Sequence, residues 1–99
     1  MDRPRRLEVW RVRRGRLVLA VQSELVEFDT VPVMPLASLG TMRPTRDVNP
    51  LVEVDGRSYI VMGQQITAVL AAELRERVAH LPDIEDKVVK AIDRMLTNS

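Results

Sequence analysis

The chain has 99 residues, of which 45% are hydrophobic and 29% charged, and it contains no cysteine. This length is enough for one small domain, and we expect residues 1–99 to form it. The lack of cysteine excludes disulfides and thiolate metal sites and fits a reducing compartment. The longest apolar stretches, such as 31–39, are too short to span a bilayer, and no signal-peptide pattern follows the charged start. We therefore expect an intact cytoplasmic protein.

The net charge is only +1, but basic and acidic residues are separated along the chain. The first sixteen residues contain Arg3, Arg5, Arg6, Arg11, Arg13, Arg14 and Arg16. Only Asp2 and Glu8 oppose them there, and many of the other acids lie downstream, from Glu73 onwards. We predict a positive field around the first hairpin, which would attract an acidic partner or a phosphate backbone. For any single arginine, the alternative is a solvated strand face.

The first half of the chain is rich in β-forming segments. Segments 7–13 and 16–22 are predicted strands, and Arg14-Gly15 between them supplies a residue that tolerates positive φ in a tight turn. Segment 31–36 is also β-rich, but its two prolines lack an N–H, which favours an edge or a bulge. The polar, proline-containing segment 41–49 is predicted to be a loop.

A second hairpin is predicted at 50–54 and 57–62. Its turn, Asp55-Gly56, suits a type I′ geometry, in which both central residues need positive φ. The following segment, 66–79, is ambiguous, because its composition favours a helix while a short strand followed by a turn would accept the same residues.

A helix is predicted at the end of the chain, ending near Leu96. Asp83 is a candidate cap, acids occupy the first turn, and Asp86 and Lys90 have the spacing of an i,i+4 pair. An apolar stripe recurs at helical spacing through Ile84, Val88, Ala91, Ile92 and Met95. Strands followed by one terminal helix indicate an antiparallel sheet or partly open barrel with a helix packed on it.

Motifs for chemistry are scarce in this sequence. His80 is the single histidine and has no ligand-like neighbours, so a surface or loop histidine is favoured and no metal or cofactor is expected. RNA cleavage without histidine stays open as an alternative, because arginines and hydroxyls can stabilise a phosphorane. It would recruit Arg14, Arg16, Ser23 and Thr30. Trp10 and Tyr59 are interpreted as core or interface residues, since the aromatics are too scattered for base stacking.

Several motifs together resemble one family. Segment 21–26 has the sequence V-Q-S-E-L-V, and 33–38 has V-M-P-L-A-S. Segments 49–56, 76–81 and 86–95 are similar to a strand and hairpin, an E-x-V-A-x-L turn and a terminal helix. In this order and spacing the segments resemble the CcdB family of bacterial toxins, from about Leu7 onwards.

The resemblance implies a mainly β (α+β) fold: an SH3-like, partly open antiparallel β-barrel with a small extra sheet and a C-terminal helix. It favours a strand or irregular structure at 66–71. It also implies a homodimer and a cognate antitoxin whose disordered tail wraps the toxin. Family members poison DNA gyrase by binding its A subunit, without catalysis. The resemblance also implies that the chain contacts DNA only indirectly, through the antitoxin complex.

Candidate binding residues follow from the same resemblance. Contacts to the target are expected from Leu25, Val26, Asp93, Leu96, Thr97, Asn98 and Ser99. Contacts to the antitoxin are expected from Arg14, Ser23 and Lys90. The alternative for the aliphatic pair Leu25-Val26 is plain core.

The end of the chain departs from the family pattern. The family ends in Trp-Gly-Ile, where this chain has Thr97, Asn98 and Ser99. Loss of an aromatic anchor typically costs an interface about 2 kcal/mol or more. The alternatives are therefore a weakened or redirected relative that acts mainly as an antitoxin partner, an endoribonuclease like the MazF toxins, or a barrel that serves only as a binding module.

Overall fold

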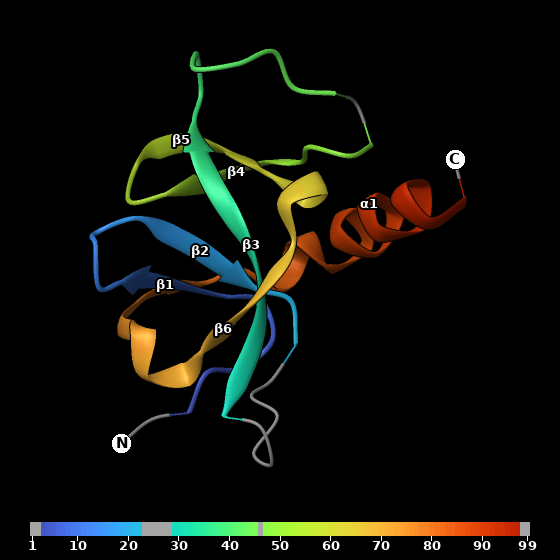
Figure 1. Cartoon of the computed structure of the whole chain (residues 1–99). Helices are drawn as coiled ribbons and strands as arrows, with labels where there is room; N and C mark the ends of the chain where they lie inside the picture. The colour runs from blue at the N-terminus through green and yellow to red at the C-terminus, as the bar shows by residue number, and fades with distance from the viewer. Residues whose placement is uncertain (1–2, 23–28, 46, 98–99) are drawn as a thin grey trace.

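A computed structural model describes residues 3–22, 29–45 and 47–97, the side chain of Thr97 aside. Its elements are β1 (Glu8–Val12), β2 (Leu17–Ala20), β3 (Thr30–Ser38), β4 (Leu51–Val54), β5 (Arg57–Val61), the 3-10 turn η1 (Gly63–Gln65), β6 (Thr67–Leu70), the 3-10 turn η2 (Ala71–Glu73), β7 (Leu74–His80), the 3-10 turn η3 (Pro82–Ile84) and α1 (Glu85–Thr97). The strands form a curled antiparallel sheet in the order β4-β5-β3-β2-β1-β7, and β6 pairs with β3 (Figure 1). The predicted mainly β fold, a partly open barrel with a terminal helix, is confirmed.

The proline-containing strand β3 lies inside the sheet and its pairings have no register shift, so the predicted edge or bulge is wrong. It pairs with β2 on one side and with β6 and β5 on the other. The carbonyl oxygen of Pro32 accepts a hydrogen bond from Val21 N at 3.0 Å, so the missing N–H faces the end of β2, where the ladder stops. The carbonyl of Pro35 accepts from Met62 N at 2.8 Å, so its missing N–H falls at the junction of β6 and β5. Both prolines thus avoid the ladder positions that need a donor.

Both predicted hairpins are confirmed. β1 pairs with β2 and β4 pairs with β5, each antiparallel. Gly15 in the first turn has φ +90°. Asp55 and Gly56 in the second turn have φ values of +52° and +79°, as a type I′ turn requires.

Residues 66–79 form strands β6 and β7 around a short 3-10 turn, so the helical alternative is wrong. The E-x-V-A-x-L segment 76–81, expected as a turn, lies largely in β7. β7 pairs with β1 from Glu8↔His80 to Val12↔Leu74, and β6 pairs with the first half of β3. The open edges of β1 and β3 offer backbone partners, and this demand outweighs propensity differences that are below about 1 kcal/mol per residue.

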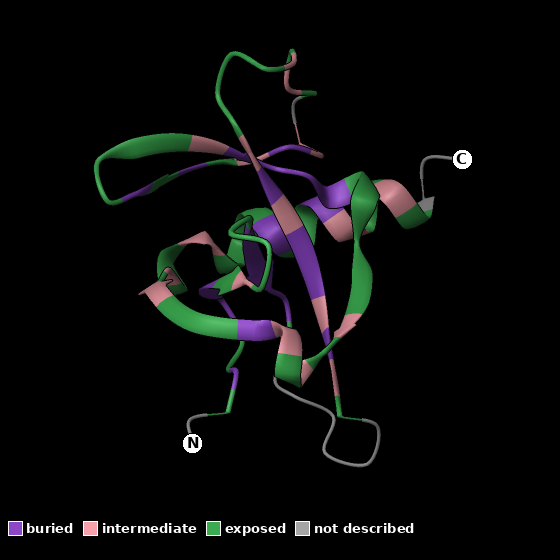
Figure 2. Cartoon of the chain, turned by 60° about the vertical axis from the view of Figure 1, so that its left-hand side comes forward, coloured by how far each residue is buried: buried purple, intermediate pink, exposed green. Residues whose placement is uncertain are grey.

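The helix α1 covers one end of the curled sheet and completes the larger of two apolar clusters. Val88 and Ala91 are fully buried, and Ile84, Ile92 and Met95 pack against the cluster, so the predicted stripe is confirmed. In Figure 2, buried and exposed positions alternate along α1. The predicted Asp83 cap is wrong, because a 3-10 turn with Pro82 in its first position precedes the helix and has no side-chain cap.

The smaller cluster lies on the other side of the sheet. It contains Trp10, Val31 and Leu74 among its buried members, which confirms Trp10 as a core residue. Within the described ranges, no helix is long and apolar enough to cross a membrane.

Candidate partner-binding surfaces

The outward side of α1 carries exposed apolar and charged side chains. Positions at i, i+4 and i+7 from Val89 share one side of the helix, which is turned away from the buried stripe that faces the sheet. Leu96 is 76% exposed and Val89 is 41% exposed, and the exposed Asp93 lies between them in sequence. Isolated exposed apolar residues are common, but here two of them share a face with a predicted target-binding residue. Thr97 is the last residue of the helix.

A cleft of about 470 Å³ separates α1 from the loop before β4. Its lining residues are Pro44, Asp47, Asn49, Pro50, Leu51, Lys87 and Lys90. Lys90 Nζ lies 3.5 Å from Asp47 Oδ1, across the cleft. The predicted Asp86–Lys90 pair is therefore wrong for the described residues, since Lys90 pairs with the loop. Asp47 offsets the charge of Lys90, and Lys87 adds positive charge near the exposed Leu51.

The loop wall of this cleft is held in place by Asn49, which ends the predicted 41–49 loop and begins the 49–56 motif. Asn49 is 4% exposed, and its Oδ1 accepts from Thr45 N at 2.9 Å. Its Nδ2 donates to Val61 O at 3.0 Å and to Gln64 Oε1 at 2.7 Å. One side chain thus ties the loop to β5 and η1. An asparagine before a proline gives no sequence signal that separates such a centre from an ordinary turn.

The positive field predicted for the first hairpin is partly neutralised in the fold. Because β7 pairs with β1, downstream acids lie beside the N-terminal arginines. The ion pairs are Arg11–Glu76 at 3.1 Å, Arg13–Glu73 at 3.6 Å and Arg6–Glu85 at 2.9 Å. Arg14 and Arg16 remain exposed in the β1–β2 turn. Basic and acidic residues that are far apart in the sequence therefore lie side by side on the folded surface.

The predicted binding residues are not all brought together. Arg14 lies in the β1–β2 turn, at the opposite side of the molecule from α1, which carries Lys90 and Asp93 (Figure 1). The remaining candidates Ser23, Leu25, Val26, Asn98 and Ser99 lie outside the described residues. The structure therefore defines two separate surfaces, the exposed side of α1 with its cleft and the basic β1–β2 turn.

Of the residues suggested for RNA cleavage, Ser23 lies outside the described residues, and Arg14 and Arg16 do not converge with Thr30. Arg16 precedes β2 and lies level with the end of β3, whereas Thr30 begins β3. Seven residues of extended chain separate those two levels, about 23 Å at the usual rise of a strand. Arg16 instead lines a shallow groove of about 450 Å³ with Ser38, Thr41 and Tyr59.

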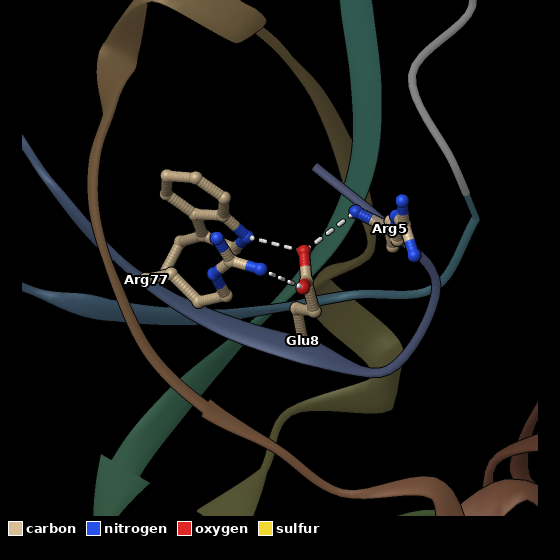
Figure 3. A network of polar contacts seen from close by, with 4 residues as sticks. Arg5, Glu8 and Arg77 are labelled. Carbon is tan, nitrogen blue, oxygen red and sulfur yellow. Dashed lines mark hydrogen bonds and ion pairs between the residues drawn. The ribbon is translucent and has the colours of Figure 1, made fainter. Parts of the chain in front are cut away.

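A buried carboxylate network joins β1 to β7 (Figure 3). Glu8 is 3% exposed, and its Oε1 accepts from Arg5 N at 2.7 Å and from Trp10 Nε1 at 3.2 Å. Its Oε2 accepts from Arg77 Nη1 at 3.1 Å, and Arg77 Cζ lies 5.9 Å from the centre of the Trp10 ring. Each carboxylate oxygen is satisfied, so this network fixes the structure. In the sequence alone, Glu8 is one residue of the predicted strand 7–13 and one of two acids among the N-terminal arginines.

No cluster of three or more potential metal ligands occurs among the described residues. His80 is exposed, which confirms the predicted surface histidine. It is the last residue of β7 and does not lie in a loop. The described surface thus defines a small β-barrel protein with an exposed helix face and a charged cleft, features suited to contacts with other macromolecules.

The comparison with protein families agrees with this class. The model of the family described as CcdB protein matches residues 7–98, nearly the whole chain, and the chain belongs to the CcdB family. No curated protein matches it. Membership implies the toxin component of a toxin–antitoxin system.

Proposed function

We propose that this toxin acts by binding the A subunit of DNA gyrase and trapping the enzyme on cleaved DNA, without catalysing a reaction itself. The observation that carries the proposal is the exposed end of α1, where Leu96 is 76% exposed at the position that the family resemblance assigns to target contact. A leucine that exposed gains apolar burial when a partner covers it. Asp93 adds a charge on the same side of the helix.

The antitoxin is proposed to bind the cleft beside α1 and the basic β1–β2 turn. Lys87 and Lys90 line the cleft next to the exposed Leu51, and Arg14 lies exposed in the turn. An acidic, disordered tail long enough to reach both surfaces would find complementary charge at each. DNA is reached only through that antitoxin complex. The proposed active form is a homodimer in the cytoplasm.

The test is a pull-down of purified gyrase A with the wild-type chain and with Leu96→Ala. We expect wild-type binding and a loss of about tenfold or more for the variant, since truncation of an interface anchor costs roughly 1–2 kcal/mol. Leu39→Ala is the matched control, because Leu39 is 50% exposed outside α1. Equal binding of both variants would contradict the assignment of α1, and no wild-type binding would contradict the gyrase proposal.

A second candidate function is a redirected or weakened family member that serves mainly as an antitoxin partner. It is favoured by the polar Thr97-Asn98-Ser99 end, which replaces the aromatic end of the family pattern. The combined substitutions Thr97→Trp, Asn98→Gly and Ser99→Ile should then create gyrase-dependent growth arrest in cells that tolerate the wild-type chain. If these cells grow as before, the chain end does not explain the weakened activity.

A further inference from the structure

A polar groove lies between the two β-hairpins, where the ladder that joins β2 to β3 ends. The β1–β2 and β4–β5 hairpins extend to the same side of β3 (Figure 1). β2 pairs with β3 only from Val18↔Pro35 to Ala20↔Val33, and the end of β3 pairs with β5. The start of β2 and the end of β3 thus border a groove of about 450 Å³, and none of the described residues that line it is acidic.

An unpaired backbone N–H of β3 points into this groove. Val21 N donates to Pro32 O at 3.0 Å, so even-numbered residues of β3 turn their backbone polar groups towards β2. Continued by three residues, the register would place Ser38 opposite Gly15. Gly15 O instead accepts from Arg11 Nη1 at 3.2 Å, and no acceptor for Ser38 N occurs within the described ranges.

Arg11 is held in a fixed orientation at one wall of the groove. Its Nε donates to Glu76 Oε1 at 3.1 Å, and its Nη1 donates to Gly15 O at 3.2 Å. Because the guanidinium is planar, these two contacts fix its plane and leave its other N–H groups for a further acceptor. Arg11 pairs with Leu17 across the hairpin, and the buried Leu17 and Leu36 form an apolar floor.

The carbonyl oxygens in the groove, which would repel an anion, already accept hydrogen bonds. Gly15 O accepts from Arg11, and Ser38 O accepts from Thr41 N at 3.2 Å and from Thr41 Oγ1 at 2.7 Å. The hydroxyl groups of Ser38 and Tyr59, which lie opposite each other on β3 and β5, have no hydrogen-bond partner in the described part of the chain. The groove therefore offers mainly donors to a ligand.

The charge around the groove matches a doubly charged anion. The end of the first hairpin carries four arginines, Arg11, Arg13, Arg14 and Arg16. Glu76 and Glu73 neutralise the first two, whereas Arg14 and Arg16 have no ion-pair partner among the described residues. This leaves an excess of two positive charges. A phosphate monoester carries about −1.5 to −2 at pH 7, more than the single charge of a carboxylate.

We propose that this groove binds a nucleoside monophosphate. Arg16 and the fixed Arg11 pair with the phosphate oxygens, and the Ser38 N–H donates to the same group. The volume is within the range of small-molecule sites and exceeds what a bare phosphate fills. The apolar floor and the ring of Tyr59 provide contact for the base. This binding site goes beyond the proposed function and does not depend on gyrase.

Isothermal titration of the purified chain with adenosine 5′-monophosphate tests the site. At low ionic strength we expect saturable binding with a Kd below about 1 mM, and about tenfold or more weaker binding for Arg16→Ala. Arg57→Ala is the matched control, because Arg57 is an exposed arginine in the other hairpin, with no ion-pair partner among the described residues, and should bind as the wild type does. No binding by the wild-type chain, or equal losses in both variants, would overturn the proposal.

The choice of ligand tests the chemistry of recognition. Adenosine, which lacks the phosphate, and inorganic phosphate, which lacks the base, should each bind at least about tenfold more weakly than the monophosphate. Equal binding of either would overturn the assignment to a nucleotide. Tetraglutamate provides carboxylates instead. If it binds more tightly than the monophosphate and depends on Arg16, the groove accepts an acidic peptide and the proposal is wrong.

Amide chemical shifts test where the ligand lies. The amide of Ser38 should shift on titration with the monophosphate, because its N–H gains an acceptor. The amide of Ser58 is the control, because Ser58 pairs with Leu39 on the side of β5 that faces β3. Binding without a shift at Ser38 would refute this location. Both experiments use the purified chain alone, so their failure leaves the gyrase proposal to its own pull-down.

Discussion

The Glu8 network provides the sharpest test of how the fold is held together. Glu8→Ala removes both acceptor oxygens from a side chain that is 3% exposed. The indole N–H of Trp10, itself 6% exposed, then loses its acceptor, as does the backbone N–H of Arg5. Arg77 loses one of its partners. The substitution therefore leaves buried donors without acceptors at the junction of β1 and β7.

The magnitude follows from the burial of each group. A buried donor left without an acceptor costs about 1–3 kcal/mol, which applies to Trp10 in full and to Arg5 in part. The Arg77–Glu8 ion pair adds little, because the Arg77 side chain is 40% exposed and screened by water. We expect Glu8→Ala to lower the free energy of unfolding by about 2–4 kcal/mol. Glu8→Gln keeps one oxygen for Trp10 and Arg5, and should cost only about 1 kcal/mol.

The assay is urea unfolding at fixed protein concentration, followed by fluorescence of Trp10, the single tryptophan of the chain. Glu76→Ala is the matched control, because it removes the same kind of side chain from the exposed 3.1 Å pair with Arg11 and should cost less than about 1 kcal/mol. If Glu8→Ala unfolds like this control, or if Glu8→Gln costs as much as Glu8→Ala, the assignment of Glu8 as a buried acceptor is refuted.

Two further predictions concern the loop beside α1. Gly63→Ala would place its Cβ 2.6 Å from Val48 O, so the backbone must shift, and we expect a loss of about 1–3 kcal/mol in thermal unfolding; an unchanged Tm would contradict this close approach. Asn49→Ala removes three hydrogen bonds that hold the loop, and hydrogen exchange at residues 45–49 should accelerate while the β1–β2 hairpin keeps its protection. Uniform acceleration across the whole chain would show that Asn49 stabilises the fold globally.

Local patterns in the sequence determined several elements without the structure. The Asp55-Gly56 turn and the apolar stripe of α1 depend on φ preferences and on spacing within a few residues, so short-range physics is enough. The composition of 66–79 favours a helix, but long-range pairing makes this segment two strands. Its fate depended on the unpaired edges of β1 and β3, which lie more than thirty residues away in sequence.

The candidate binding surfaces show the same division. The sequence alone identified the family, the terminal helix and Lys90 as a candidate, because motif order and residue type survive without coordinates. Tertiary structure decided that Lys90 faces Asp47, that Glu8 is a buried acceptor, and that downstream acids neutralise the first arginines. It also decided where the ladder between β2 and β3 ends. These contacts depend on which segments, distant in the sequence, become neighbours in space. Strand pairing determines those neighbours only when the whole sheet assembles.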